Sequence, residues 1–513
     1  MEYSSPVYWF SVLVSCILLL LSVLLWRRKT KMPPLPPGPP AWPVVGNLFQ
    51  LGKKPNDSLF ALSRQYGPLM TVSLGMKKTV VVSTSAMAKE VLKTHDHNFA
   101  GRTLIQAMKV LSYHKSSLIW GQYGPYWRKL RRICTTEFLS PKKLQASHHV
   151  RRDSVFEMIR LIFEEHCVKG KSVPIGVTMN RTGLNLIGNM IFSTKVFDPS
   201  NPDCVELTNA LTSWAKLCQK PNLADFFPWL GFLDLHGVGR KIGVELKRAQ
   251  HCLDLFISNR LARSSTELGN EREARKDFLD SLLELRDQGD HDLSLTEIRS
   301  IVFELLVAGS DTTGATLEWA MAELIHNPHT MKRAQAELEE VVGRERRVEE
   351  SDMDHLPYLR AVVKEVFRLH PVAPLLLPHR ADSSCEIMGF VIPKDTQIWV
   401  NVWAIGRDPA VWKEASKFMP ERFLEDEKSK MDFKGQDFDL IPLGAGRRIC
   451  VGLPLADKMV HLILASLIHS FDWSLPDGIS VEEMDMSDVF GIVLKKRLEL
   501  QAIPTPRLPH SLY

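Results

Sequence analysis

Paired cysteines and nucleotide-binding loops are missing from this sequence. Its eight cysteines are widely spaced along 513 residues and none forms a CxxC pair, so neither a zinc site nor a disulfide framework is indicated. No GxGxxG loop follows a predicted strand, and the chain therefore has no dinucleotide-binding motif of its own. Charge of one sign is not in excess, because 64 basic and 59 acidic residues give a net charge of only +5. That balance disfavours a nucleic-acid-binding protein, which would normally carry a basic stripe.

The composition is that of a globular protein, with 45% apolar and 24% charged residues. These fractions exclude a disordered chain, collagen and a polytopic membrane protein. Alternating apolar residues predict strands at 69–74 and 79–82 around a turn at Gly75, and short strand-like runs occur within 385–402. From about 120 to 340, apolar residues recur at three- and four-residue spacing, which predicts helices. We therefore expect a mainly α fold with smaller β-sheets (α+β), in which residues 264–294 form an exposed loop or a solvated helix.

The N-terminal part differs from the rest of the chain. Pro6 to Trp26 is an apolar run without a charge, long enough at 1.5 Å per residue to cross ~30 Å of hydrocarbon as one transmembrane helix. Basic residues at 27, 28, 29 and 31 follow, which favours an uncleaved anchor over a cleaved signal peptide and places the body in the cytosol. We predict a membrane anchor with its basic stop at 1–32, a proline-rich hinge at 33–40 and a globular body at 41–513.

One cysteine lies in an unusual setting, the segment PLGAGRRICVG at 442–452. Its glycines permit tight turns and the close approach of a flat ligand. Backbone N–H groups and two neighbouring arginines would hold the sulfur of Cys450 as a thiolate, and a haem iron held by a thiolate favours O–O cleavage. The alternative is a structural cysteine buried in a loop, and this segment alone does not decide between the two.

The run GRRICVG at 446–452 resembles the haem-binding loop of the cytochrome P450 monooxygenases, and three further motifs follow that family's order and approximate distances. In KEVFRLHP at 364–371, Glu365 and Arg368 are three residues apart and share a helix face. In the family this pair is buried and is joined by an arginine that corresponds to Arg422 of FMPERF at 418–423. The resemblance implies the cytochrome P450 fold, Cys450 as the axial ligand of haem b, and a structural role for Glu365, Arg368 and Arg422.

The motif AGSDTT at 308–313 lies in a helical pattern that runs from about Thr296 to Asn327. Threonine hydroxyls can bond to carbonyls of the preceding turn and open the helix, which would leave polar groups to line a cavity. The resemblance implies that Thr312 donates a hydrogen bond to oxygen at the haem and that Asp311 relays protons from water. Without Cys450, an ordinary helix with exposed polar residues would be the better interpretation.

The motif YGPYWRKLRR at 123–132 carries two stripes of polar side chains. Arg128 and Arg132 form one stripe, which together with Lys129 could face an acidic electron-donating partner or could be a solvated basic face. Trp127 and Arg131 are four residues apart and form the other stripe, which the resemblance implies would donate to the anionic haem propionates. The donors that the resemblance implies are Trp127, Arg131, His379 and Arg448.

Leu443 departs from the family pattern, which normally has Phe seven residues before the cysteine. That aromatic ring packs near the sulfur and tunes the ligand environment. Leucine keeps the site apolar without the ring, so we expect haem to bind with a shifted potential or spectrum. The alternative that the chain is a poorly active member of the family also stays open.

The substrate cavity implied by the resemblance is largely apolar, which suits a neutral, hydrophobic small molecule. Its wall would be formed by Leu104, Met108, Ala308, Val372, Leu376, Phe490 and Ile492, although each of these could also be ordinary core. The hinge, the run at 308–313 and the segment DFKGQDF at 432–438 look most like plant microsomal members. Among these, the chain is most similar to the geraniol hydroxylases, iridoid oxidases and abietane-diterpene oxidases.

Together these features predict a single-pass haem-thiolate monooxygenase of the endoplasmic reticulum membrane, whose cytosolic catalytic domain at 41–513 oxidises a plant mono- or diterpenoid with O2. Electrons would come from NADPH through a separate NADPH-cytochrome P450 reductase, because the chain lacks a nucleotide-binding loop. Two alternatives stay open. One is a reductase-independent haem enzyme that rearranges a hydroperoxide, against which Asp311 and Thr312 argue. The other is a non-catalytic haem- or lipid-binding membrane protein, for which Leu443 is the only hint.

Overall fold

The computed structural model describes residues 34–264, 276–288 and 293–513. The membrane anchor predicted at 6–26 lies outside these residues. Within them, no helix combines the length and the apolar character needed to cross a membrane. The described part of the hinge lies against the body, because the carbonyl of Pro37 accepts a hydrogen bond from the N–H of Thr71 (2.8 Å) and that of Pro34 accepts one from Val391 (3.2 Å).

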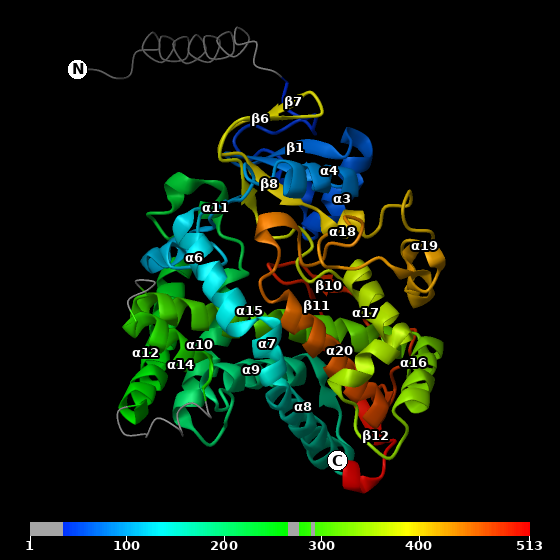
Figure 1. Cartoon of the computed structure of the whole chain (residues 1–513). Helices are drawn as coiled ribbons and strands as arrows, with labels where there is room; N and C mark the ends of the chain where they lie inside the picture. The colour runs from blue at the N-terminus through cyan, green and yellow to red at the C-terminus, as the bar shows by residue number, and fades with distance from the viewer. Residues whose placement is uncertain (1–33, 265–275, 289–292) are drawn as a thin grey trace, which may run out of the picture.

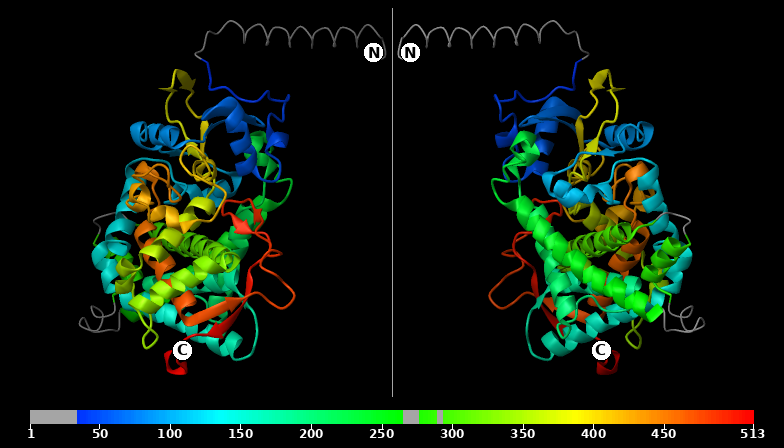
Figure 2. Two further views of the ribbon diagram at one scale, coloured as in Figure 1. Left: turned by 90° about the vertical axis from the view of Figure 1, so that its right-hand side faces the viewer. Right: turned by 90° about the vertical axis from the view of Figure 1, so that its left-hand side faces the viewer.

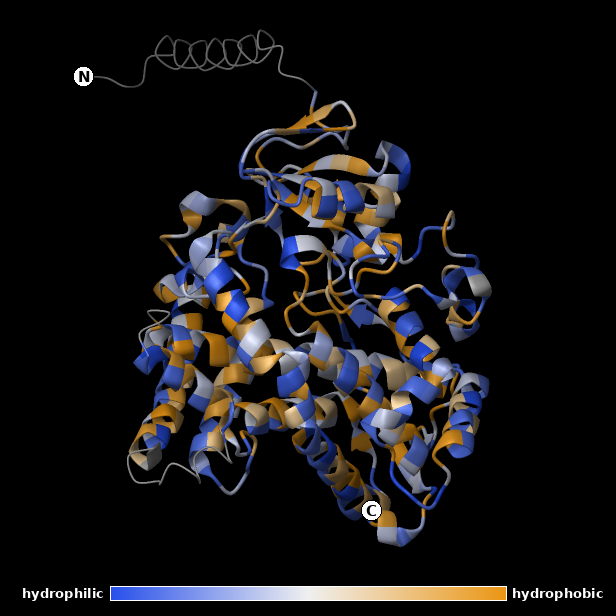
Figure 3. Cartoon of the chain, viewed as in Figure 1, coloured by the Kyte–Doolittle hydropathy of each residue, from blue (hydrophilic) through white to orange (hydrophobic). Residues whose placement is uncertain are grey.

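The body is mainly helical with small sheets, as predicted (Figure 1). The longer helices are α3 (Pro55–Tyr66), α6 (Pro125–Ile133), α8 (His148–Ile162), α9 (Ile175–Phe192), α10 (Pro202–Cys218), α12 (Val238–Ser264), α14 (Phe278–Asp287), α15 (Leu295–His326), α16 (Pro328–Val341), α17 (Pro357–Leu369) and α20 (Leu453–Ser470). The short helices are α2 (Leu48–Leu51), α4 (Ser85–Lys89), α5 (Gln106–Lys109), α7 (Pro141–Ala146), α11 (Leu223–Phe226), α18 (Val402–Ile405) and α19 (Asp426–Ser429). Figure 3 shows that apolar and polar residues alternate along helices such as α12, as expected for helices with one buried face.

Most strands come from the two ends of the body, including the runs predicted at 69–82 and within 385–402. The largest sheet has five strands in the order β1-β2-β8-β5-β3, in which β2 pairs antiparallel with β1 and parallel with β8. The strands are β1 (Leu69–Leu74), β2 (Lys77–Val82), β3 (Gly101–Arg102), β4 (Val173–Pro174), β5 (His379–Arg380), β6 (Cys385–Ile387), β7 (Phe390–Ile392), β8 (Gln397–Val400), β9 (Phe471–Ser474), β10 (Asp488–Val489), β11 (Lys495–Lys496) and β12 (Gln501–Pro506). In Figure 2 the red C-terminal segment lies along one side of the helices.

The turn between β1 and β2 requires its glycine. Gly75 has φ +58°, and a Cβ atom there would lie 2.7 Å from the carbonyl oxygen of Phe226. The N–H of the next residue, Met76, donates to that same carbonyl (3.0 Å). Close backbone approach and a positive φ together explain why this turn has glycine.

The helix α15 lies at the centre of the helical body, where it packs against α9, α17 and α20. It begins with a capping box in which the Ser294 hydroxyl and the Glu297 carboxylate satisfy each other's backbone N–H groups. Its 32 residues remain helical through the run at 308–313, so the threonines there do not interrupt the helix. Gly309 and Gly314 serve close packing, because a Cβ atom at each would lie within 2.3 Å of Ile187 and 3.0 Å of Asn180, respectively, on α9.

The expectation of an exposed loop or solvated helix at 264–294 is wrong for residues 278–287. These residues form α14, in which Phe278, Leu279, Leu282 and Leu283 are buried. The positions recur at helical spacing, and α14 packs against α9, whereas among the charged residues of this helix only Asp280 is buried. The high charge of the surrounding segment hid this apolar stripe.

Candidate functional site

Cys450 lies immediately before the N-terminus of α20, in a loop whose backbone bonds are directed at it. Its N–H donates to the carbonyl of Leu443 (3.0 Å), and the N–H groups of Gly452 and Leu453 point at its sulfur. Burial raises the pKa of the thiol, while these N–H groups and Arg131 act in the opposite direction. Cys450 nevertheless keeps accessible surface, so it could be reached by a ligand. A thiolate here needs a further positive charge, and a bound metal ion supplies one.

The cysteine loop is held against the helical turn Glu90–Thr94 by a glycine. Gly446 has φ +66°, and a Cβ atom there would lie 1.9 Å from the carbonyl oxygen of Leu92. Leu443 has its side chain packed against the main apolar core while its carbonyl holds Cys450. The loop conformation therefore depends on Gly446, whereas the effect of Leu443 on a haem spectrum stays a prediction.

Three arginines, Arg102, Arg131 and Arg448, lie near this loop and near one another. Arg448 is buried and donates to the carbonyls of Ala100 and Gly121, each at 2.7 Å. Burial and the charges of Arg102 and Arg131 lower its pKa to about 8. Among the described residues its Nη1 has no hydrogen-bond partner. A buried cationic group with an unused N–H is suited to an anionic ligand.

Trp127 and His379 lie beside these arginines. The indole N–H of Trp127 donates to the carbonyl of Leu118 (2.7 Å), and Arg448 lies over its ring with 4.1 Å to the centroid. Nδ1 of His379 is 2.7 Å from the carbonyl of Phe99, and burial holds the pKa of this imidazole well below its usual range. Because the indole N–H is the only donor of the Trp127 side chain, its bond to Leu118 already uses that donor. Its role as a propionate donor stays a prediction, and its ring supports the arginines directly.

The side chains of the 308–313 run on α15 differ in their contacts. The hydroxyl of Thr312 donates to the carbonyl of Ala308 (2.6 Å), four residues earlier. Asp311 is half-buried and pairs with Lys495 of β11, which is itself half-exposed. Asp311 is therefore connected to a side chain that reaches solvent, although Lys495 was not expected from the sequence.

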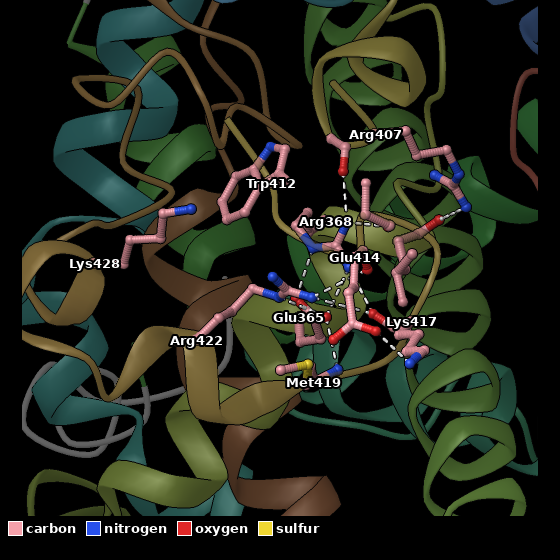
Figure 4. A network of polar contacts seen from close by, with 12 residues as sticks. Glu365, Arg368, Arg407, Trp412, Glu414, Lys417, Met419, Arg422 and Lys428 are labelled. Atoms are coloured by element: carbon pink, nitrogen blue, oxygen red, sulfur yellow. Dashed lines mark hydrogen bonds and ion pairs between the residues drawn. The ribbon is translucent and has the colours of Figure 1, made fainter. Parts of the chain in front are cut away.

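Glu365, Arg368 and Arg422 meet in one buried network (Figure 4). Arg368 binds the Glu365 carboxylate through two hydrogen bonds of 2.7 Å, and Arg422 approaches it at 3.1 Å. The N–H of Met419 adds a fourth contact at 2.8 Å, and Arg368 also donates to the carbonyl of Gly406. The network thus ties α17 to the chain at 406–422, which precedes the cysteine loop.

The seven residues predicted to line a substrate cavity come from separate parts of the apolar core. Met108 and Val372 are buried, and the other five are half-buried. Leu376, Val372 and Phe490 each belong to a different apolar cluster from Met108. Leu376 lies beside the cysteine loop, 3.7 Å from the position of a Cβ atom on Gly444. Their common role as a cavity wall stays a prediction.

Comparison with known proteins places this architecture in a family. A sequence model of cytochrome P450 matches residues 36–501. The chain is 42% identical to cytochrome P450 76C2 from Arabidopsis thaliana over 483 residues, which cover 94% of each chain. It is 41% identical to a geraniol 8-hydroxylase from Swertia mussotii, covering 94% of this chain and 95% of the relative. It is 40% identical to the flavonoid 3'-monooxygenase CYP75B137 from Crocosmia x crocosmiiflora, covering 98% and 99%.

The chain therefore belongs to the cytochrome P450 family, as its motifs predicted. It is an oxidoreductase of the monooxygenase type and is similar to plant members that include geraniol 8-hydroxylases. The family implies a haem cofactor, and the residues present fit it. An accessible thiol lies next to a helix N-terminus, and nearby is the buried Arg448, whose Nη1 has no partner within the described part of the chain.

Proposed function

We propose that the chain is an NADPH- and O2-dependent haem-thiolate monooxygenase that hydroxylates a hydrophobic plant terpenoid. The observation that carries this proposal is the Cys450 thiol at the start of α20, next to a buried arginine cluster. Cys450 would hold the iron, while Arg131, Arg448 and His379 would hold the propionates. Haem held by a thiolate supplies the oxidising chemistry, and the protein supplies orientation and dryness.

Asp311 and Thr312 would handle protons at this site. The Thr312 hydroxyl can keep its bond to Ala308 while its lone pairs accept, or can rotate to donate elsewhere. Asp311, paired with half-exposed Lys495, would take protons from solvent and pass them inward. An intact proton pathway favours a monooxygenase over an enzyme that rearranges hydroperoxides, which needs no such delivery.

Two relatives, and the apolar character of the residues predicted to line the substrate cavity, support a terpenoid substrate. Two relatives named geraniol 8-hydroxylase match at 40–41% identity. The flavonoid 3'-monooxygenase, at 40%, favours a flavonoid as the second candidate. Incubating microsomes that contain the chain and a reductase with mono- and diterpenoids and flavonoids, and identifying the products, decides between the two. Turnover without NADPH would contradict the monooxygenase proposal.

We also propose that the chain is anchored in the endoplasmic reticulum membrane by one helix at 6–26, with the domain at 41–513 in the cytosol. Large exposed apolar side chains on two adjoining parts of the chain, within 42–76 and 229–232, support a membrane-facing surface. Those side chains are Trp42, Val44, Phe49, Met76, Trp229 and Phe232, which are 60–82% exposed. The segments adjoin because Met76 is hydrogen-bonded to Phe226. For the reductase, exposed Arg128 and Arg132 on α6 would supply a basic docking face.

Replacing Asp311 by Asn or Thr312 by Ala should lower product formation about 10²-fold with the haem content unchanged, because positioned proton transfer contributes about 10²–10⁴ in rate. NADPH oxidation should fall less than product formation. The measurement is product formed per NADPH oxidised. Thr316→Ala is the matched control, since the Thr316 hydroxyl makes the same bond to a carbonyl four residues earlier (2.9 Å). Equal losses in Thr316→Ala and Thr312→Ala would contradict the assigned role.

A further inference from the structure

A buried carboxyl group on α15 has no part in the site described above. Glu304 is 4% exposed and is the lone acid in the apolar stretch IVFELLV at 301–307. Its carboxyl accepts hydrogen bonds from the hydroxyl of Tyr113 (2.9 Å) and from that of Ser117. It also accepts bonds from the backbone N–H groups of Leu118 (2.7 Å) and Ile119 (3.2 Å). All four donors belong to the chain between Tyr113 and Gly121, called here the 113–121 segment.

The carbonyl groups of the same segment hold Trp127 and Arg448 of the proposed propionate site, and also Arg102 beside them. Leu118 accepts from the indole of Trp127 (2.7 Å), and Ile119 accepts from Nε of Arg102 (3.3 Å). Gly121 accepts from Nη2 of Arg448 (2.7 Å). The two residues that bind Glu304 through their N–H groups, Leu118 and Ile119, are thus the ones whose carbonyls hold Trp127 and Arg102, so both sets of contacts should move together.

Aromatic rings close the carboxyl off from water. The ring of Tyr113 packs edge-on against those of Trp214 and Phe303, with centroids 5.9 and 5.8 Å apart. Hydrogen bonds in such a dry site are strong, and a donor left without its acceptor there is costly. Loss of the carboxyl would therefore release the segment and would not simply let water take its place.

We propose that Glu304 is a positioning residue, whose carboxyl fixes the 113–121 segment against α15 and thereby sets the positions of Trp127, Arg102 and Arg448. The consequence for haem rests on the function proposed above. The anchoring of the segment does not depend on that function.

Protonation gives this anchor a measurable signature. Burial raises the pKa of Glu304 to about 7, although its four donors lower it. The other titratable groups that face it are Tyr113, Tyr126 and Cys134, in each of which burial raises the pKa further above neutrality. When the segment opens, the pKa of Glu304 would return to its ordinary value of 4.5, so the closed form binds the proton more tightly than the open form. Opening should therefore become roughly 10²-fold more favourable between pH 5 and pH 8.

The test is amide hydrogen exchange of the full-length holoprotein across the 113–121 segment at several pH values, corrected for intrinsic exchange. Glu304→Leu should lose protection in this segment at every pH and should release haem faster. In Glu304→Gln, the side-chain carbonyl can accept from the two N–H groups while its NH2 donates to the two hydroxyls. This variant should therefore keep the protection and lose the pH dependence, which a merely space-filling role would not produce.

Matched controls are Glu318→Leu and Glu318→Gln. Glu318 is another buried acid of α15, but it accepts from the N–H of Leu500 (2.9 Å), so the 113–121 segment should exchange as in the wild type. Unchanged protection in folded Glu304→Leu would overturn the proposal. Faster exchange without faster haem release would overturn the link to Trp127, Arg102 and Arg448. If Glu304→Leu does not fold, the pH dependence of exchange in Glu304→Gln decides. A pH dependence in this variant equal to that of the wild type would overturn the proposal that Glu304 anchors the segment. A wild type that binds no haem would refute the proposed function, while exchange in that protein still tests the anchor.

Discussion

Cys450→Ala is expected to abolish product formation and the red-shifted ferrous–CO band that thiolate-ligated haem gives. The reason is that the loop directs its N–H groups and the start of α20 at this one sulfur. Alanine offers no lone pair to a metal, and the surrounding glycines offer no other side chain. The measurement is the CO difference spectrum of reduced microsomes, together with product analysis in the presence of a reductase.

Cys385→Ala is the matched control for this prediction. Cys385 is a half-buried thiol on β6, 3.6 Å from Nδ1 of His95, and belongs to a different part of the fold. This variant should keep the band and the activity. A band that survives in Cys450→Ala, or a wild type that stays colourless with ample porphyrin, would refute the haem-thiolate proposal.

The longest helix shows what the sequence predicted well. The pattern indicated a helix from about Thr296 to Asn327, and α15 spans Leu295–His326. Both ends have local causes, a capping box at Ser294 and a proline at 328 directly after the final cap. The strand at 69–74 was likewise predicted with the bounds of β1, because alternation and a glycine turn are local signals.

Contacts between distant segments could not be predicted in the same way. The three-residue spacing placed Glu365 and Arg368 on one face, but the carbonyls that surround Arg368 come from Gly406, Ala415 and Lys417. Glu304 was missed altogether, because its donors lie 185 to 191 residues earlier in the chain. The available signal was a single acid within an apolar helical stretch, which indicates a buried carboxyl that needs partners.

Arg368→Met is expected to lower the free energy of unfolding by about 3–5 kcal/mol, because removing one partner of a buried ion pair leaves the other charge uncompensated. Here, among the described residues, the change removes two of the four contacts of the fully buried Glu365 carboxylate, leaves it with Arg422 as its one cation, and takes the donor from three backbone carbonyls. Methionine matches much of the volume, so a cavity contributes little to the loss. The measurement is urea unfolding of the purified holoprotein, together with the rate of haem loss on heating.

An exposed arginine–glutamate pair is the control that separates the effect of the buried network from that of a surface contact. Arg333 is 54% exposed and contacts Glu421 at 3.0 Å, and Arg333→Met should cost less than about 1 kcal/mol because solvent screens such a pair. Both variants replace arginine with methionine at an arginine–glutamate contact, so the difference between them measures what burial and the three carbonyl contacts of Arg368 add. Because Arg368 ties α17 to the segment before the cysteine loop, its loss should also speed haem release, whereas Arg333→Met should not. Equal stabilities of the two variants would mean that the network in Figure 4 contributes no more than a surface contact.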